Sequence, residues 1–506
     1  MPENLNLVTF DTQKDFYLYL NDFFQGGESI KSPSSINIGT VTLTRRAYSQ
    51  EIKDFYITRN TVRSYLIPFD GESDDKFMSR IQTSYYFNIV SQVVSAYADS
   101  VTSKVMRNLG ALEPFLNTNV DYRENSWAEY VSHCAKMTAL YGMTATVIDF
   151  SLPEGVSVNS RNDLLLNDLG PKTILVTPLA FAWMKTTSLG EVVEFAYYEN
   201  FIEDTQYNAY AVLRIVTPEG FKKIQIDSLN TSKNVYAQIA DRGVVLDEGK
   251  NSSALRGKLP VVFNFYERDY NTSYPSGKSL VNDLVDTARS VYNYCSWASD
   301  VHQRAAFPIL TIPLARTGGV MPPKTEIAVG TNNALPYDSE SGTPSFIAAP
   351  SDPTREIREH INFMIQRSYQ LLGLSMVVDE GSIQSGEALK IRSREFENNA
   401  AKFASYMRKF EEKVITNFKN LLGMQDVETT IIYPKTFSIP QTAQDFANAQ
   451  NMLAIPFLSV EGKMEALNQM VSIALSVDDQ KLNEIIEGSK AILQSESLPP
   501  ATPIAQ

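Results

Sequence analysis

The spacing of apolar residues predicts a mixed first half of this chain. Apolar positions three or four residues apart indicate helices over Ser84–Met106 and Ser126–Tyr141, and Gly142 closes the second. Short runs rich in β-branched and aromatic residues indicate strands. These runs are Thr144–Phe150, Thr173–Thr177, Val192–Tyr198, Ala209–Val216, Lys222–Ile226 and Val261–Tyr266. We therefore expect residues 1–260 to form an α+β domain.

Beyond residue 275 the pattern changes to long helices. The first is predicted from a cap at Ser276 or Ser279 to Pro308, and it spans about 40 Å at 1.5 Å per residue. Asp352 and Pro353 are typical of a second helix start, and Gly373 is predicted to end that helix. Residues 309–350, between the two, hold six prolines and four glycines, which indicates short strands and loops.

A polar loop over residues 375–385 leads into a third helix that Ser385 is expected to cap. Its stripe of Phe and Met side chains continues to Gly423, which is longer than the usual globular helix. Thr429–Tyr433 is predicted to be a strand. Residues 441–493 are predicted to form three short helices, and the Pro/Ser/Ala-rich end, Ser495–Gln506, is expected to be disordered.

Composition narrows the possible functions. The chain has 506 residues, too many for a single core, and a formal net charge of −13. Tight binding to nucleic acid depends on Lys and Arg neutralising phosphates, so the acidic balance argues against a repressor-like protein. Cys134 and Cys295 have no disulfide or zinc spacing. With no apolar run of membrane-spanning length and no signal-peptide pattern, we expect a soluble protein that is made in the cytoplasm.

One segment is similar to a nucleotide-binding loop. Ser276-Gly277-Lys278-Ser279 follows a predicted strand and precedes a helix, as a phosphate-binding P-loop does. However, Thr272 stands where that motif needs glycine, and Pro275 lacks a backbone N–H. We interpret the segment as a helix start with a serine cap.

Other candidate chemistry is weak. The three histidines, His133, His302 and His360, fall in predicted helices without metal-ligand spacing, and His302 lies on the apolar stripe of its helix. We expect no catalytic residue, no metal and no cofactor, and therefore no enzyme.

Four short motifs occur in a defined order. Tyr141-Gly142 follows a helix, Gly277-Lys278-Ser279-Leu280 precedes the first long helix, and Val291-Tyr292-Asn293 lies within it. The third long helix opens with Ser385, Gly386, Glu387, Ala388, Leu389 and Lys390. In this order and spacing, the chain resembles the portal proteins of tailed double-stranded DNA bacteriophages.

The resemblance implies a portal fold with wing, stem, clip and helical crown, assembled as a ring. The implied parts are a wing at 1–260, a strand, loop and first stem helix at 261–308, a clip at 309–351, a second stem helix at 352–374, a tunnel loop at 375–385, a long wing helix and return strand at 386–440, a crown at 441–493 and a disordered tail at 494–506.

The resemblance also implies a function. Portal proteins form a ring, usually of twelve subunits, at one capsid vertex, through which viral DNA is packaged and ejected. The expected partners are further copies of the chain, double-stranded DNA, terminase, major capsid or scaffolding proteins, and head-completion or tail adaptor proteins, with no membrane. The protein is expected in the virion after assembly in the host bacterial cytoplasm.

The tunnel loop is the segment that the resemblance places nearest to DNA. Its DNA-facing residues are expected to be Val378, Asp379, Glu380, Gly381, Ser382 and Gln384. We expect Asp379 and Glu380 to lie near the narrowest constriction, where carboxylates repel phosphates and let the duplex slide; simple solvated loop charge is the alternative. Two other functions stay open: a terminase-like packaging ATPase/nuclease, and another structural virion protein.

Overall fold

The structure is a computed structural model. It describes residues 5–10, 13–31, 35–38, 41–44, 56–57, 63–150, 160–203, 208–230, 233–255, 257–306, 309–314, 334–338, 346–347, 352–374, 386–434 and 437, all in the first unit of the chain, Met1–Phe437. These residues mix helices and strands, which confirms the α+β class. The predicted tunnel loop, crown and tail lie outside them. None of the described helices combines the length and the apolar character that crossing a bilayer requires.

The larger sheet has six strands. Its order is β1 (Asn6–Thr9), β9 (Phe181–Thr186), β10 (Val192–Glu203), β11 (Asn208–Val216), β12 (Gly220–Asn230) and β13 (Val244–Lys250), and every neighbouring pair is antiparallel. The sequence predicted β10, β11 and β12. It did not predict β9, whose residues are nearly all buried, or the exposed edge strand β13. One helix, α8 (Val235–Arg242), packs on this sheet where the ring of Tyr236 meets that of Trp183 at 5.3 Å.

A smaller buried sheet has the order β14 (Val261–Phe265), β7 (Met143–Asp149), β8 (Lys172–Val176). Helix α6 (Trp127–Tyr141) precedes β7. Ser126 and Glu129 form a capping box at its start, and Gly142 ends it at φ 85°. The predicted helix, glycine stop and following strand are therefore confirmed.

The N-terminal helices are α1 (Lys14–Gln25), α3 (Asp74–Thr83) and α4 (Ile89–Thr102). The predicted helix from Ser84 to Met106 was too long at both ends, because α4 ends at Thr102 and Met106 begins the strand β6 (Met106–Asn108). Ser84 follows the end of α3, and Asn88 caps α4 by accepting a hydrogen bond from the Ser91 N–H at 3.0 Å. The short elements are α2 (Glu28–Lys31), β2 (Ser35–Ile38), β3 (Val41–Thr44), β4 (Tyr56–Ile57), β5 (Arg63–Ser64), α5 (Glu113–Leu116), α7 (Arg161–Leu166) and single 3-10 turns at Gly110–Leu112, Pro178–Ala180 and Ser253–Leu255.

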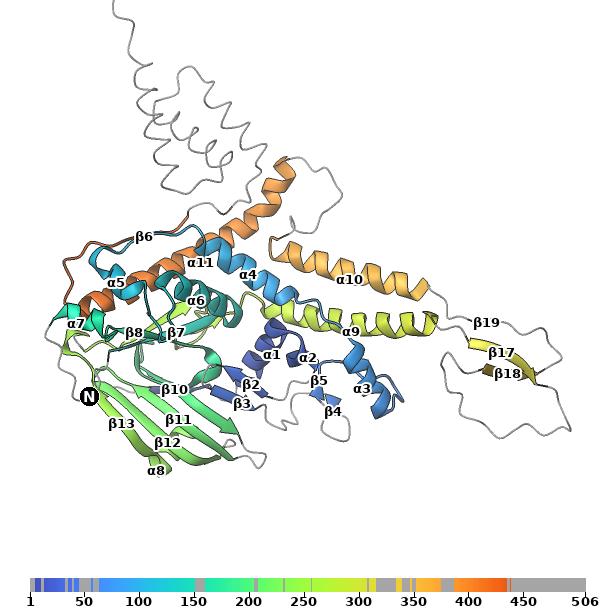
Figure 1. Ribbon diagram of the computed structural model, residues 1–506, viewed down its shortest axis with the longest axis horizontal. Helices are drawn as coiled ribbons and strands as arrows, with labels where there is room; N and C mark the ends of the chain where they lie inside the picture. The colour runs from blue at the N-terminus through green and yellow to red at the C-terminus, as the bar shows by residue number, and fades with distance from the viewer. Residues whose placement is uncertain are drawn as a thin grey trace, which may run out of the picture. The chain divides into compact units, whose positions relative to one another are not determined.

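The long helices are α9 (Asn282–Ala306), α10 (Asp352–Leu371) and α11 (Gly386–Leu421). Helices α9 and α10 lie side by side (Figure 1). The chain between them forms a separate sheet of order β18 (Ala334–Asp338), β17 (Ile309–Leu314), β19 (Phe346–Ile347). After α11, β20 (Thr430–Ile432) pairs with β6 (Met106–Asn108). The three predicted long helices, the strand-bearing excursion and the return strand are thus confirmed.

Candidate functional site

The helix pair α9–α10 is the feature that the sequence singled out, and it has a core of its own. Val291 and Cys295 of α9 are buried against Ile361 of α10. Partly buried side chains surround this core: Tyr294, Ile357, Met364 and Ile365. The ring of His360 packs on that of Tyr294 at 4.8 Å, so His360 is a packing residue here. His302 lies further along α9, and its side chain is exposed.

The start of α9 is fixed where two glycines meet. A β-carbon on Gly142 would lie 2.6 Å from the carbonyl oxygen of Gly277, and one on Gly277 would lie closer still to the oxygen of Gly142. Hydrogen bonds join the segments here: Leu280 N–H donates to Ala139 O at 3.0 Å and the Ser279 hydroxyl to Leu140 O at 2.6 Å. Two motifs quoted from the sequence, Tyr141-Gly142 and Gly277-Lys278-Ser279-Leu280, therefore form one junction.

This junction also decides the nature of the Ser276–Ser279 segment. Gly277 and Lys278 form strand β16, which pairs with β15 (Glu267–Arg268). The predicted helix start at Ser276 or Ser279 was therefore too early, since α9 begins at Asn282. Because Gly277 is covered by the backbone of Gly142, it cannot take part in a phosphate cradle.

Further along α9, polar side chains fasten the helix to the N-terminal region. The Asn293 amide accepts a hydrogen bond from Ile67 N–H at 2.8 Å and donates to Tyr65 O at 3.1 Å. One turn away, the buried Arg80 guanidinium donates to the Ser296 hydroxyl at 3.0 Å. The Tyr-Asn step of the sequence motif thus fixes α9 to the extended segment around Tyr65.

The end of α10 meets the wall of α4 and α11. The Tyr97 hydroxyl of α4 donates to Leu372 O at 2.6 Å, and its ring packs on Phe396 of α11 at 4.7 Å. Gly373 has φ 70°, and a β-carbon there would lie 2.5 Å from the backbone nitrogen of Phe396. Only glycine fits this close approach, which explains why the helix predicted to end at Gly373 does end there.

Helix α11 is fixed by a fully buried carboxylate. Arg107 on β6 donates two hydrogen bonds of 2.8 Å to Glu411, and the Trp127 indole N–H donates a third, also at 2.8 Å. The Tyr433 hydroxyl donates a fourth. Burial and then the Glu411 charge raise the pKa of Tyr433 far above its ordinary value. The carboxylate therefore has its hydrogen bonds satisfied inside the protein, and it joins β6, α6, α11 and the segment after β20.

Sequence reasoning missed this group. The partners of Glu411 come from segments 22 to 304 residues away, so no local pattern connects them. The one available signal was position, because Glu411 lies four residues after Met407 and three before Val414, on the apolar face of the helix.

Some predicted site residues lie outside the described part of the chain. They are Val378, Asp379, Glu380, Gly381, Ser382, Gln384 and Ser385. Gly386, Glu387, Ala388, Leu389 and Lys390 form the first residues of α11, as predicted for a helix start.

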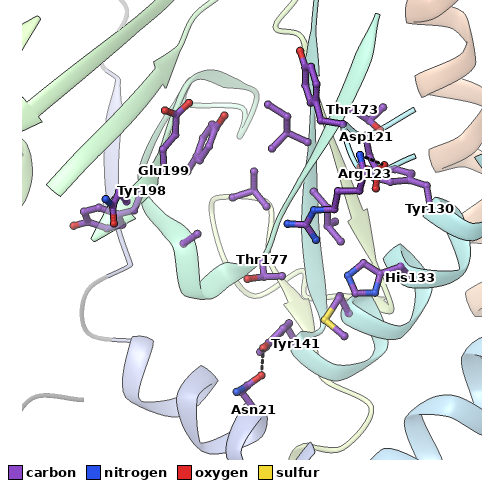
Figure 2. A pocket seen from close by; sticks show the side chains of 18 of the residues that line it. Asn21, Asp121, Arg123, Tyr130, His133, Tyr141, Thr173, Thr177, Tyr198 and Glu199 are labelled. Carbon is purple, nitrogen blue, oxygen red and sulfur yellow. Dashed lines mark hydrogen bonds between the residues drawn. The ribbon is translucent and has the colours of Figure 1, made fainter. Parts of the chain in front are cut away.

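A cleft of about 1190 Å³ opens between α6, β8 and the six-stranded sheet (Figure 2). Arg123 and His133 line one side, and Tyr198 and Glu199 the other. Burial, and then the charge of Arg123, lower the pKa of His133 below its ordinary value, so the ring is neutral at pH 7. The Glu199 carboxylate binds the Lys223 ammonium at 2.6 Å. No sequence motif predicted this cleft, because the residues that line it come from widely separated segments.

No family model matches this chain, and no curated protein matches it significantly.

Proposed function

We propose that this chain is the subunit of a phage portal, a ring through which double-stranded DNA enters and leaves a capsid. The observation that carries the proposal is the paired helices α9 and α10, which bracket a separate three-stranded sheet and are followed by a third, 36-residue helix. This order matches the stem, clip and long wing helix of the portal family that the sequence motifs resemble.

The way in which the three long helices are attached to the rest of the subunit supports a role in a rigid channel wall. Each of the three is joined to the body by buried contacts: α9 at Gly277 and Asn293, α10 at Gly373, and α11 at Glu411. A subunit that forms part of a channel wall must hold its helices at a constant angle while a polymer moves past them. Fully satisfied, buried polar groups provide such rigidity.

The outer surface of α10 suits contact with a neighbouring copy. Phe363 is a large apolar side chain that is 60% exposed in the single chain. Glu359 and Arg367, one turn before and one turn after it on α10, are exposed and carry opposite charges. A ring needs a heterologous interface, in which two different patches of the subunit meet. An aromatic anchor with charges around it is typical of the centre and rim of such an interface.

The net negative charge of the chain suits a channel through which DNA slides better than a protein that binds DNA tightly. A helix of 25 residues is about 38 Å long, so it passes about 22 phosphates of duplex at one charge per about 1.7 Å. If a fixed cation bound each phosphate, the DNA would be held. A subunit of net charge −13 repels the duplex weakly and lets it slide.

The remaining partners follow from the same proposal. The sheet of β17, β18 and β19, in the clip region 309–351, is the part we assign to terminase during packaging and to head-completion or tail adaptor proteins afterwards. Major capsid or scaffolding proteins would contact the ring at the capsid vertex.

Native mass spectrometry of the purified full chain tests this proposal. The expected spectrum has one dominant assembly, with a mass that is a fixed whole-number multiple of 56.6 kDa and close to twelve copies. A spectrum of monomers at every concentration tested contradicts the proposal.

A further inference from the structure

The six-stranded sheet has two exposed apolar edges. Within the described ranges no strand pairs with the outer edge of β1 or of β13. Leu7 on β1 is 40% exposed, and Val245 on β13 is 50% exposed. Neither Leu5–Thr9 nor Val244–Leu246 contains a charge. Proteins usually protect free sheet edges with charged residues. The second half of β13 carries Asp247, Glu248 and Lys250, but its first half and the whole of β1 have no such protection, which favours a strand pairing along these two segments in the assembled state.

Strand direction is compatible with a second copy of the chain as the occupant of both edges. All five strand pairings in this sheet are antiparallel, so strand direction alternates from one edge to the other. With six strands, β1 and β13 run in opposite directions. A second copy placed alongside in the same orientation therefore brings its β1 antiparallel to β13, and the alternation continues across the boundary.

The faces of the two edges also match. Leu7 lies opposite Lys185, whose ammonium sits 4.7 Å from the centre of the Tyr236 ring of α8. Val245 lies opposite Ile224, which lines the hollow under α8 together with Tyr236. Residues directly opposite each other share one face of a sheet, so Leu7 and Val245 are both on the α8 face. In a continued sheet these two side chains can pair directly.

We propose that β13 of one copy pairs antiparallel with β1 of the next, with Leu7 opposite Val245 and Val8 opposite Val244. The sheets of neighbouring copies then form one continuous sheet. This arrangement covers both edges with one heterologous interface, as a ring requires, whereas two-fold pairing of β13 with β13 leaves β1 uncovered. The inference deepens the proposed portal ring and rests on it for closure.

Disulfide trapping in the full-length protein tests the pairing. Side chains directly opposite in an antiparallel pair have β-carbons about 4.5–5.5 Å apart, close enough for a disulfide after a small adjustment. The native Cys134 and Cys295 are buried and free, so we expect few cross-links between copies from them. The test variant carries Leu7→Cys and Val245→Cys together. The matched controls carry one of these substitutions each.

The expected result is a ladder of covalent multimers from the oxidised double variant on a non-reducing gel, and monomers from either single variant. Dimers from Val245→Cys alone indicate two-fold pairing and overturn the inference. A ring in electron micrographs without cross-links in the double variant also overturns it but leaves the portal proposal standing. Monomers without any ring overturn both.

A second variant tests the same pairing independently of disulfide formation. Val245→Lys places a charge on the β13 edge, and we expect a several-fold loss of assembled protein on size-exclusion chromatography. Leu189→Lys is the matched control, since Leu189 is 95% exposed and lies in a turn between β9 and β10. Full assembly of Val245→Lys contradicts the edge pairing.

Discussion

Arg107 and Glu411, 304 residues apart in the sequence, form a bidentate ion pair inside the protein with two nitrogen–oxygen distances of 2.8 Å. Glu411 is fully buried, and the Arg107 side chain is 12% exposed. Burial lowers the pKa of Arg107, but the hydrogen bonds and charge of Glu411 outweigh it, so the pKa is raised and the guanidinium stays charged. The pair fastens the longest helix to the strand β6, and with it one wall of the proposed ring subunit.

Removing one charge of this pair should be costly. Glu411→Gln leaves the Arg107 charge buried without its counter-ion, and breaking a buried pair in this way costs about 3–5 kcal/mol. We expect a clear drop in the urea midpoint of unfolding at fixed protein concentration. Glu412→Gln is the control, because Glu412 is half-exposed and pairs with Arg408 one turn away on the surface, a contact worth about 0.3–0.5 kcal/mol. Equal midpoints for the two variants contradict the role given to Glu411.

The glycine junction predicts a graded series. Gly257→Ala meets no atom within 4 Å and pays only for its positive φ, about 1–2 kcal/mol. Gly142→Ala has the same backbone strain and also clashes with Gly277. This overpacking lowers the free energy of unfolding by a further amount of about 1–3 kcal/mol. Gly277→Ala isolates the clash, because Gly277 has no positive φ. Thermal unfolding should show Gly142→Ala to be less stable than Gly257→Ala, and the reverse order contradicts the junction.

Local pattern predicted the three long helices, helices α4 and α6, and strands β7, β8, β10, β11, β12, β14 and β20, but not helices α3 and α8 or strand β9. Helix α6 carries its own start and stop signals in Ser126 and Gly142, and Gly373 and Gly423 mark the helix ends near them. The start of α9 was misplaced, because the pairing of Gly277–Lys278 with Glu267–Arg268 is a non-local contact that replaces a helical turn. The edge strands β1 and β13 were not predicted for the same reason, since each is defined by its pairing with a neighbouring strand.

In the candidate site, too, the local motifs could be predicted from the sequence and the contacts between distant segments could not. The motifs around Gly142, Gly277 and Asn293 were found from the sequence, although their mutual contacts were not. The Glu411 cluster joins four segments that no local pattern connects, so it could be recognised only in three dimensions.

The anchor between α3 and α9 should give a pH-dependent contribution to stability. Burial tends to raise the pKa of Glu72, but hydrogen bonds from Arg80 and from the backbone of Phe69 outweigh it and lower that pKa below its ordinary value of 4.5. A depressed folded-state pKa stabilises the fold above the unfolded value, and this contribution is lost as pH falls through the folded value.

Glu72→Gln should therefore be less stable than the wild type at pH 7, and the gap should narrow as the pH is taken below 4.5. Chemical denaturation at a series of pH values measures this gap. Glu219→Gln, at an exposed turn, is the control and should show no such trend. A gap that is constant with pH contradicts the assignment.

The alternative hypothesis, that the protein is a packaging ATPase, can also be tested directly. Because Gly277 is packed against Gly142, the Ser276–Ser279 segment should not bind ATP. We expect the purified protein to release no phosphate from ATP above background, and Lys278→Ala to leave that background unchanged. Hydrolysis that depends on Lys278 favours the enzyme and contradicts this interpretation of the segment.

The acidic pair Asp379 and Glu380 carries the prediction about DNA passage. Asp379→Lys with Glu380→Lys replaces two repelling charges per subunit by two that bind phosphate. Packaging should slow, and the rate should become strongly salt-dependent, because screening weakens the new attraction. Lys390→Glu serves as a charge-changing control at the start of α11. An unchanged packaging rate and salt response in the double variant contradicts a DNA-facing role for the pair.

Electron microscopy of the purified full-length protein tests the central claim most directly. We predict closed rings of identical subunits with a central opening wide enough for duplex DNA. Solitary particles without any opening, at concentrations where the protein is folded, contradict the claim.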